Sequence, residues 1–229
     1  MSIDNQAREQ RILDAAAQLI IQFGYDKTTM SDVADAVGLN RALVYAHFKS
    51  KDDVLEALIA REMQKYGQVW FEYILADPKG GTVASIYRGI AYALKQTPFM
   101  AAIVTRDEGT WGKYLRKPGN IFTGMQTASM TRDLMLAMQA AGAIRKDVNI
   151  PAMAYIVDVL SNGMVKHGNH PYTSDFPPDD ELLETTAEMF DRMLTPEDGG
   201  DLEAGKNVLR QIAEAARAHY EQRKEQPER

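Results

Sequence analysis

Residues 8–58 decide the fold of this chain: they read REQRILDAAAQLIIQFGYDKTTMSDVADAVGLNRALVYAHFKSKDDVLEAL. In the first part of this stretch, from Ile12 to Phe23, apolar residues recur at three- and four-residue steps, which is typical of the buried face of an α-helix. A helix is therefore expected over Asp4–Phe23. Gly24 follows it, as expected of the residue that takes a positive φ just past a helix end.

The next residues predict two short helices joined by a tight turn. Thr29 and Asp32 have the spacing of a capping box, although aspartate replaces the usual glutamate, and a second helix is expected to begin there. Gly38 closes this helix and permits a tight turn, and Asn40 is a good N-cap for a third helix. Together these features predict a helix-turn-helix.

The third helix is expected to present a polar face that suits DNA. Val44 and Phe48 face inward at i, i+4, so their neighbours are left outside. Arginine can donate two hydrogen bonds to guanine in the major groove, and lysine, tyrosine and histidine can contact phosphates. The threonines and free N–H groups at the start of the second helix form another expected phosphate site. The predicted DNA contacts are Lys27, Thr28, Thr29, Asn40, Arg41, Ala42, Tyr45, His47, Lys49 and Lys51. An ordinary solvated surface is the alternative, and it fits any single residue better than the whole set.

This stretch resembles the TetR family of bacterial transcriptional regulators. The resemblance rests on the ILDAA start, FGYDKTT, the VADAVGL turn and VYAHFKSKDDVL, within residues 8–58 of 229. It implies an N-terminal DNA-binding domain, a helical ligand-binding domain and a homodimer that usually represses transcription until a small molecule releases it. Asn40 stands where the family often has Ser or Thr, and it caps equally well. Ala42 stands where Gly is common, and its methyl group could contact a thymine methyl.

The charge of the chain does not by itself point to DNA. The whole chain has a net charge of −6, and residues 1–60 hold six Lys/Arg against nine Asp/Glu, a net charge of −3. A basic domain is the simpler expectation for a DNA-binding protein. However, the basic residues are expected to cluster beside the third helix, and several acids fall in first helical turns, where the helix dipole favours them. We therefore expect weak non-specific binding and steeply salt-dependent specific binding.

The remainder of the chain reads as helices separated by glycine and proline, with no alternating strand pattern of any length. Ser50 and Asp53 offer a second capping box ahead of the first of them. The expected helices are Lys51–Ala76, Val83–Gln96, Pro98–Glu108, Ile121–Ala141, Pro151–Gly168, Asp179–Leu194 and Leu202–Gln222. The predicted fold class is all-α: a three-helix helix-turn-helix DNA-binding domain at residues 1–55, a larger helical ligand-binding and dimerisation domain at 56–225, and a disordered tail at 226–229.

Aromatic and methionine side chains gather in the segments that the family resemblance makes the walls of a ligand pocket. Apolar linings with a few polar groups build small-molecule sites, and methionine adds adaptable surface. The predicted ligand contacts are Trp70, Tyr73, Tyr92, Phe99, Trp111, Tyr114, Phe122, Met125 and Met138. The charged residues between Arg106 and Arg116 could add polar contacts or form a lid. The alternative is that these side chains only fill the core. An apolar or aromatic effector is the class that this lining favours.

Two later helices carry apolar stripes that are expected to form a dimer interface. The resemblance places both helices in a four-helix interface between subunits, and a large apolar patch is unusual on a monomer. The predicted interface residues are Tyr155, Ile156, Val159, Gly163, Leu182, Thr186, Met189, Phe190 and Met193. A purely intramolecular core is the alternative. The helix from Leu202 is expected to brace this interface or to cover the pocket.

The sequence offers little for catalysis. It has neither a phosphate-cradling glycine-rich loop nor a GxSxG elbow, and the pair His167 and His170 is better explained as a loop than as metal ligands. The chain has no cysteine, which excludes disulfides and thiolate metal sites. We therefore expect no enzyme activity, no cofactor and no metal. With no signal segment and no apolar run of 18 residues, a cytoplasmic protein with no membrane association is expected.

These observations favour a ligand-responsive transcriptional regulator, most simply a repressor. Its expected partners are a double-stranded DNA operator, a small-molecule effector and a second copy of the chain. The alternative is a helical ligand-binding protein that acts through a protein partner without regulated DNA binding. The intact set of Arg41, Tyr45, His47 and Lys51 argues against that alternative.

Overall fold

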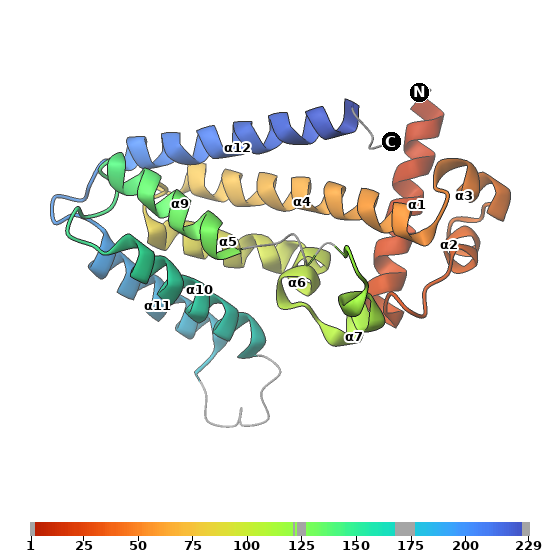
Figure 1. Ribbon diagram of the computed structural model, residues 1–229, viewed down its shortest axis with the longest axis horizontal. Helices are drawn as coiled ribbons and strands as arrows, with labels where there is room; N and C mark the ends of the chain where they lie inside the picture. The colour runs from red at the N-terminus through yellow and green to blue at the C-terminus, as the bar shows by residue number, and fades with distance from the viewer. Residues whose placement is uncertain (1–2, 121, 123–126, 168–176, 226–229) are drawn as a thin grey trace. The chain divides into compact units, whose positions relative to one another are not determined.

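The computed structural model is helical throughout and describes residues 3–120, 122, 127–167 and 177–225 (Figure 1). No strand occurs in these ranges, so the all-α prediction is confirmed. The elements are α1 (Ile3–Phe23), α2 (Met30–Val37), α3 (Arg41–His47), α4 (Lys51–Ala76), α5 (Val83–Gln96), α6 (Pro98–Thr105), α7 (Glu108–Trp111), the 3₁₀ helix η1 (Gly112–Arg116), α9 (Thr127–Ala140), α10 (Ile150–His167), α11 (Asp179–Leu194) and α12 (Leu202–Glu225).

The chain divides into two compact units. Unit 1 consists of the described residues of Met1–Tyr66 and Leu94–Met125, and unit 2 consists of those of Gly67–Ala93 and Gln126–Arg229. Each unit has a hydrophobic core of its own. Unit 1 therefore contains α6, α7 and η1 in addition to the helix-turn-helix. The boundary expected after residue 55, between a DNA-binding domain and a ligand-binding domain, concerns function and stays a prediction.

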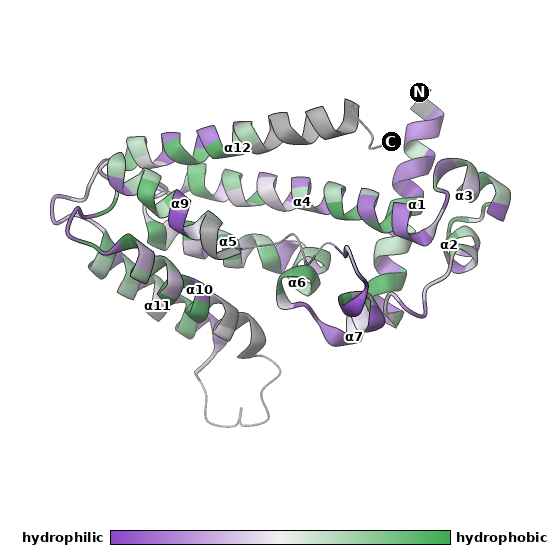
Figure 2. Ribbon diagram, in the orientation of Figure 1, coloured by the Kyte–Doolittle hydropathy of each residue, from purple (hydrophilic) through white to green (hydrophobic). Residues whose placement is uncertain are grey.

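The first helix is amphipathic mainly in its second half. Figure 2 shows that the half of α1 nearest the amino terminus is hydrophilic and that the following half is hydrophobic. Ile12, Ala16 and Ile20 are buried, and Gly24 ends the helix with φ 88°, as predicted. Phe23 has the spacing of the same face but is 49% exposed. The buried face thus stops one turn before the helix does.

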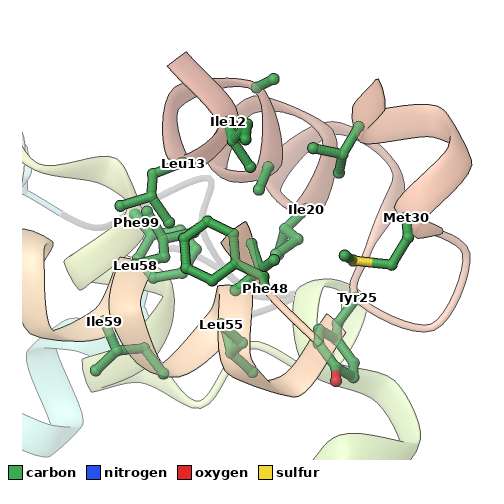
Figure 3. Packing of buried hydrophobic residues seen from close by; sticks show 14 of the residues in the cluster. Ile12, Leu13, Ile20, Tyr25, Met30, Phe48, Leu55, Leu58, Ile59 and Phe99 are labelled. Atoms are coloured by element: carbon green, nitrogen blue, oxygen red, sulfur yellow. The ribbon is translucent and has the colours of Figure 1, made fainter. Parts of the chain in front are cut away.

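The core of unit 1 joins α1 to the helix-turn-helix, to the start of α4 and to α6 (Figure 3). Ile12, Leu55 and Leu58 are completely buried, and Phe99 reaches this cluster from α6. Burial of one such side chain stabilises the fold by about 1.5–3 kcal/mol relative to leaving it in water. The ring of Tyr25 lies at the edge of the cluster in Figure 3, with its hydroxyl directed away from the other side chains. A helix-turn-helix of this size therefore shares its core with segments that come much later in the chain.

The segment after Pro98 differs from its prediction. A helix was expected to run from Pro98 to Glu108, but α6 ends at Thr105 because Arg106 adopts the left-handed conformation, with φ 49° and ψ 47°. Asp107 then caps α7, since its carboxylate accepts hydrogen bonds from the backbone N–H and the hydroxyl of Thr110 at 2.7 and 2.6 Å. Residues expected to form only a break thus form two short helical turns, α7 and η1.

Unit 2 is built around buried side chains from α4, α5, α9, α10, α11 and α12. Ile74, Met138 and Leu209 are completely buried, and the ring of Phe190 packs edge-on against Tyr87 with centroids 5.2 Å apart. Such an edge-to-face pair contributes about 0.5–1.5 kcal/mol beyond the area that it buries. These contacts fix α11 against α5.

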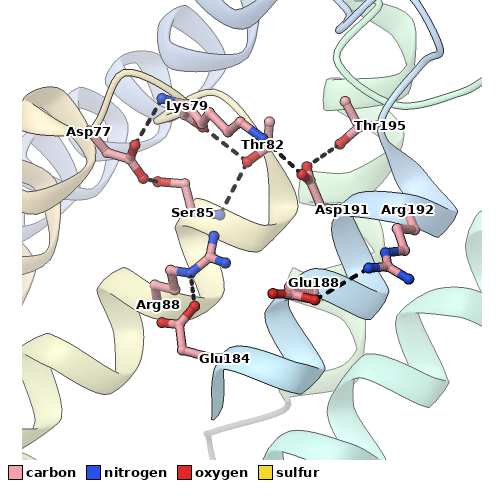
Figure 4. A network of polar contacts seen from close by, with 10 residues as sticks. All are labelled: Asp77, Lys79, Thr82, Ser85, Arg88, Glu184, Glu188, Asp191, Arg192 and Thr195. Carbon is pink, nitrogen blue, oxygen red and sulfur yellow. Dashed lines mark hydrogen bonds and ion pairs between the residues drawn. The ribbon is translucent and has the colours of Figure 1, made fainter. Parts of the chain in front are cut away.

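A polar network joins the turn after α4 to α5 and α11 (Figure 4). The Asp77 carboxylate accepts from the Ser85 hydroxyl at 2.6 Å, which ties the end of α4 to the first turns of α5. Lys79 pairs with Asp191 at 3.1 Å, and Arg88 pairs with Glu184 at 2.8 Å. Both ion pairs are partly exposed, so each is worth only about 0–1 kcal/mol, and their effect is mainly to set the position of α11.

The same turn contacts α12 through glycines. A Cβ on Gly81 would lie 2.0 Å from the carbonyl oxygen of Leu202, and a Cβ on Gly205 would lie 2.3 Å from the carbonyl oxygen of Gly81. No side chain fits at either position unless the backbone moves. The start of α12 is therefore packed directly on the backbone of the turn between α4 and α5.

We expect Gly81→Ala to destabilise unit 2 by about 1–3 kcal/mol, the usual cost of forcing extra atoms into a packed site. The matched control is Gly67→Ala, because Gly67 lies within α4 and has open space where a Cβ would stand. That change is expected to stabilise the helix by about 0.5–1 kcal/mol. Thermal unfolding followed by circular dichroism measures both. Equal stabilities of the two variants would contradict the close contact at Gly81.

Several sequence predictions lie outside the described residues. They are residues 121 and 123–126 of the helix expected from Ile121, which include Met125, the side chains of His167 and His170, and the tail at 226–229. Of the helix expected over Ile121–Ala141, the structure describes α9 from Thr127 to Ala140. In the described part of the chain, no helix is both long and apolar enough to cross a bilayer.

Candidate nucleic-acid interface

The helix-turn-helix is held by caps at both sides of its turn. Thr29 and Asp32 form the predicted capping box: the N–H of Asp32 donates to the Thr29 hydroxyl at 3.2 Å, and the N–H of Thr29 donates to the Asp32 carboxylate at 2.8 Å. Gly38 ends α2 with φ 66°, and the Asn40 side chain accepts from the N–H of Leu43 at 2.9 Å. Each such cap contributes about 1 kcal/mol. The orientation of α3 is therefore fixed by local hydrogen bonds.

The outward face of α3 carries the predicted reading residues. Arg41, Ala42 and Tyr45 are exposed, with Tyr45 at 50%, while Val44 is buried beneath them. His47 is partly buried and Lys49 is exposed. Sequence reasoning missed Leu43, which is 38% exposed on the same helix. Its spacing of four residues from His47 was the signal that could have placed it on that face.

The two neighbouring threonines before α2 have different surroundings. The Thr28 side chain is buried, and its hydroxyl donates to the carbonyl oxygen of Gly24 at 2.9 Å. Thr29 is exposed, and its hydrogen bonds lower the pKa of the Asp32 carboxyl below the ordinary value. Lys27 is also exposed. The predicted phosphate site thus retains Lys27, Thr29 and the first N–H groups of α2, whereas the hydroxyl of Thr28 serves the fold.

Lys51 also differs from the free surface charge that the sequence suggested. Its ammonium donates to the carbonyl oxygens of Tyr25 and Thr28 at 2.6 and 2.9 Å and lies 4.0 Å from the centre of the Tyr25 ring. Burial lowers the pKa of this ammonium. Lys51 therefore ties the link between α1 and α2 to the first turn of α4.

A second contact in this region was not foreseen. The Asp52 carboxylate accepts hydrogen bonds from the Tyr25 hydroxyl and from the Lys117 ammonium. The hydrogen bond from Lys117, and after it the hydrogen bond from Tyr25, lowers the pKa of the Asp52 carboxyl below its ordinary value. Burial, with the bond to Asp52, raises the pKa of the Tyr25 hydroxyl. At neutral pH the group is therefore a carboxylate held by a neutral phenol and an ammonium.

The predicted ligand residues fall into two groups, one in each unit. In unit 1, Trp111 is completely buried, and its ring N–H donates to the carbonyl oxygen of Ala102 at 2.8 Å. Phe99 and Phe122 meet this ring edge-on, each with centroids 5.5 Å away, and Tyr114 lies at 6.1 Å. These rings cover one another closely, as core residues do.

The unit 2 group is more open. Trp70 and Tyr73 are partly buried and pack over Gly89, where a Cβ would lie 3.1 Å from both rings. Tyr92 is 46% exposed and lies 5.1 Å from Tyr73, centre to centre. Met138 is completely buried in the core of this unit. The rings of this group are therefore more exposed than those of the filled cluster of unit 1, although Trp70 and Tyr73 pack closely on Gly89.

The stripes predicted for a dimer interface are mostly exposed. On α10, Tyr155 and Val159 are 68% and 52% exposed, and Ile156 and Gly163 are exposed with them. On α11, Met189 and Met193 are exposed, and Leu182 and Thr186 are partly buried. One predicted residue lies elsewhere: Phe190 is completely buried against Tyr87, because it points about 100° around the helix from Met189.

Comparison with known proteins agrees with this architecture. Residues 12–58 match the family described as bacterial regulatory proteins, tetR family. Over 164 residues the chain is 26% identical to the HTH-type transcriptional repressor Rv1474c of Mycobacterium tuberculosis, a match that spans 69% of this chain and 81% of that protein. A regulator of Bacillus subtilis, YvkB, is 35% identical over 60 residues, which are 26% of this chain and 32% of its own length.

A solved structure shows how far the fold likeness extends. The crystal structure of a gamma-butyrolactone receptor, an ArpA-like protein, superposes with a TM-score of 0.56 at 15% identity and covers 91% of this chain and all of its own. At this identity the likeness concerns the fold alone. The shared fold therefore includes helical segments that follow the helix-turn-helix.

Proposed function

Because the chain belongs to the TetR family of bacterial transcriptional regulators, we propose that it is a ligand-responsive repressor, and not an enzyme, that binds a near-palindromic DNA operator as a homodimer. The observation that carries this proposal is the exposed face of α3, which presents Arg41, Ala42 and Tyr45. The helix is held in place by the Asn40 cap and by the buried Val44. A helix held in this way can enter the major groove. Such a protein acts in the cytoplasm, where bacterial DNA lies.

The homodimer is supported by the apolar stripes of α10 and α11. Tyr155, Ile156 and Val159 repeat at helical spacing on one exposed face, and Met189 and Met193 do so on the other helix. In a two-fold symmetric dimer, each subunit presents the same patch to its partner. Two copies would then place their α3 helices in successive major grooves, one helical turn of DNA apart.

The proposed effector is a small apolar or aromatic molecule. The partly exposed rings of Trp70, Tyr73 and Tyr92 support this class, because apolar and aromatic walls with few polar groups bind such ligands. Its binding would tilt α4 and change the spacing of the two α3 helices. To do so, the effector must bind one spacing better than the other, typically by about 1–3 kcal/mol.

Selection of bound duplexes from a random DNA pool tests the function. We expect the purified protein to enrich an inverted repeat, which would also supply a labelled operator for ligand screening. A folded, dimeric protein that enriches no sequence would overturn the proposal, provided that mass spectrometry of the extracted protein finds no releasing ligand carried through purification. In that case, a protein that binds its ligand and acts through a protein partner becomes the better account.

A further inference from the structure

The segment of residues 106–120, here called the connector, is hydrogen-bonded to the link between α1 and α2. The N–H of Tyr25 donates to the carbonyl oxygen of Thr110 at 2.7 Å, and the N–H of Lys113 donates to the Asp26 carboxylate at 2.9 Å. Both partners belong to unit 1. The connector, coloured largely hydrophilic around α7 in Figure 2, is thus attached to the chain just before the predicted phosphate site at the start of α2.

Two glycines show how closely the segments meet. A Cβ on Gly24 would lie 2.9 Å from the carbonyl oxygen of Gly109, and a Cβ on Gly112 would lie 2.5 Å from the Asp26 carboxylate. Both glycines also have positive φ, 88° and 48°. A side chain at Gly24 would press on the backbone of the connector, whereas one at Gly112 would displace the Asp26 carboxylate from its place beside the connector. The two segments are therefore in close contact at both glycines.

Tyr25 is the centre of the contact. Its ring packs against Tyr114 of the connector with centroids 4.8 Å apart, and the Lys51 ammonium lies over that ring. Its hydroxyl donates to Asp52, which also pairs with Lys117 of the connector. One buried residue thus joins the connector, the link and the first turn of α4.

The connector is itself braced. Beside the Asp107 cap and the buried ring of Trp111, the Asn120 side chain donates to the carbonyl oxygens of Leu115 and Lys117 at 3.0 and 2.7 Å. Internal hydrogen bonds and buried contacts of this kind raise the free energy of local opening of a segment. The connector can therefore pass a displacement to the link rather than absorb it.

We propose that the connector is a clamp that sets the position of the link, and with it the phosphate-contacting start of α2, so that operator affinity depends on whether the clamp is engaged. This proposal rests on the proposed function. The link consists of residues 24–28 and runs directly into the Thr29 cap, while the Lys51 ammonium donates to the carbonyl oxygens of Tyr25 and Thr28 within it. Lys117 and Asp52 are positioning residues in this scheme, since they act through Tyr25 and not on DNA.

Two substitutions that change the net charge in opposite directions test the clamp. Lys117→Gln removes a positive charge, and Asp52→Ala removes a negative one, but both break the same ion pair. Simple electrostatics predicts weaker DNA binding for the first and tighter binding for the second. The clamp predicts weaker binding for both, by about 5-fold or more, measured as Kd on the selected operator. Arg116→Gln is the matched control for the charge, because Arg116 is the exposed neighbour of Lys117.

Hydrogen exchange of the protein without DNA provides a second readout. Both variants are expected to exchange the amides of Tyr25 and Lys113 faster than the parent, with thermal unfolding of the rest of the protein unchanged. Tighter operator binding by Asp52→Ala, or unchanged exchange in both variants, would overturn the clamp while leaving the proposed function intact. If the parent protein selects no operator but both amides are protected normally, the proposed function is wrong. The clamp would then have no operator affinity to control.

Discussion

Ile156→Glu is expected to convert the homodimer into monomers and to weaken operator binding by about 100- to 10,000-fold. Ile156 is 44% exposed on the same face of α10 as Tyr155 and Val159. A two-fold interface receives every substitution twice, and an unpaired buried carboxylate costs several kcal/mol. A monomer then contacts one half-site only and loses the high effective concentration that links the two binding events, which is worth this range of affinity.

Leu136→Glu is the matched control, because Leu136 is 43% exposed on α9, a helix that carries neither of the two predicted stripes. Molar mass from light scattering and operator Kd from fluorescence anisotropy are measured for the parent and both variants, with circular dichroism to check the fold. A dimer that survives Ile156→Glu, or that dissociates equally with Leu136→Glu, would place the interface elsewhere.

The local parts of the fold could be predicted from the sequence because their causes lie within a few residues. The Thr29 and Asp32 capping box, the left-handed Gly38 and the Asn40 cap each depend on hydrogen bonds or φ values inside one turn. These predictions are confirmed. The bounds of α4, Lys51–Ala76, were also predicted as observed, because the proline and glycine residues that follow Asp77 end the helix.

Contacts between distant segments could not be predicted in the same way. Lys49 and Lys51 look alike in the sequence, yet Lys49 is exposed, whereas Lys51 lies on the Tyr25 ring. The ion pair between Asp52 and Lys117 spans 65 residues. No periodicity encodes such a pair, because it depends on how α7 and η1 fold back onto the link.

The predicted ligand residues illustrate the same limit. Trp70 and Trp111 are both tryptophans in segments predicted to line a pocket, and hydrophobicity alone gives them the same role. Trp111 is completely buried and packs against three other rings, whereas Trp70 is only partly buried over Gly89. Whether an aromatic side chain fills a core or borders a ligand depends on its neighbours in three dimensions, which a single sequence does not specify.

Arg41→Ala is expected to weaken operator binding by roughly 30-fold or more while leaving the fold unchanged. A bidentate interaction with a base is worth about 1–3 kcal/mol, and a dimer would forfeit two of them. Arg41 is the first residue of α3 and is exposed, and the cap that fixes this helix comes from Asn40. Removal of the Arg41 side chain is therefore expected to leave the structure intact. Arg132→Ala on α9 is the control for the charge, since Arg132 is also exposed and belongs to unit 2.

A repeated selection from the random DNA pool distinguishes base recognition from phosphate binding. If Arg41 reads a base, Arg41→Ala relaxes the preference at one position in each half-site. Lys49→Ala is expected to weaken all sequences alike and to make the salt dependence less steep by about 1 for each phosphate that is no longer bound. If Arg41→Ala weakens all sequences equally, Arg41 holds a phosphate. If it binds like the parent, α3 is not the reading helix, and the assignment of this surface is wrong.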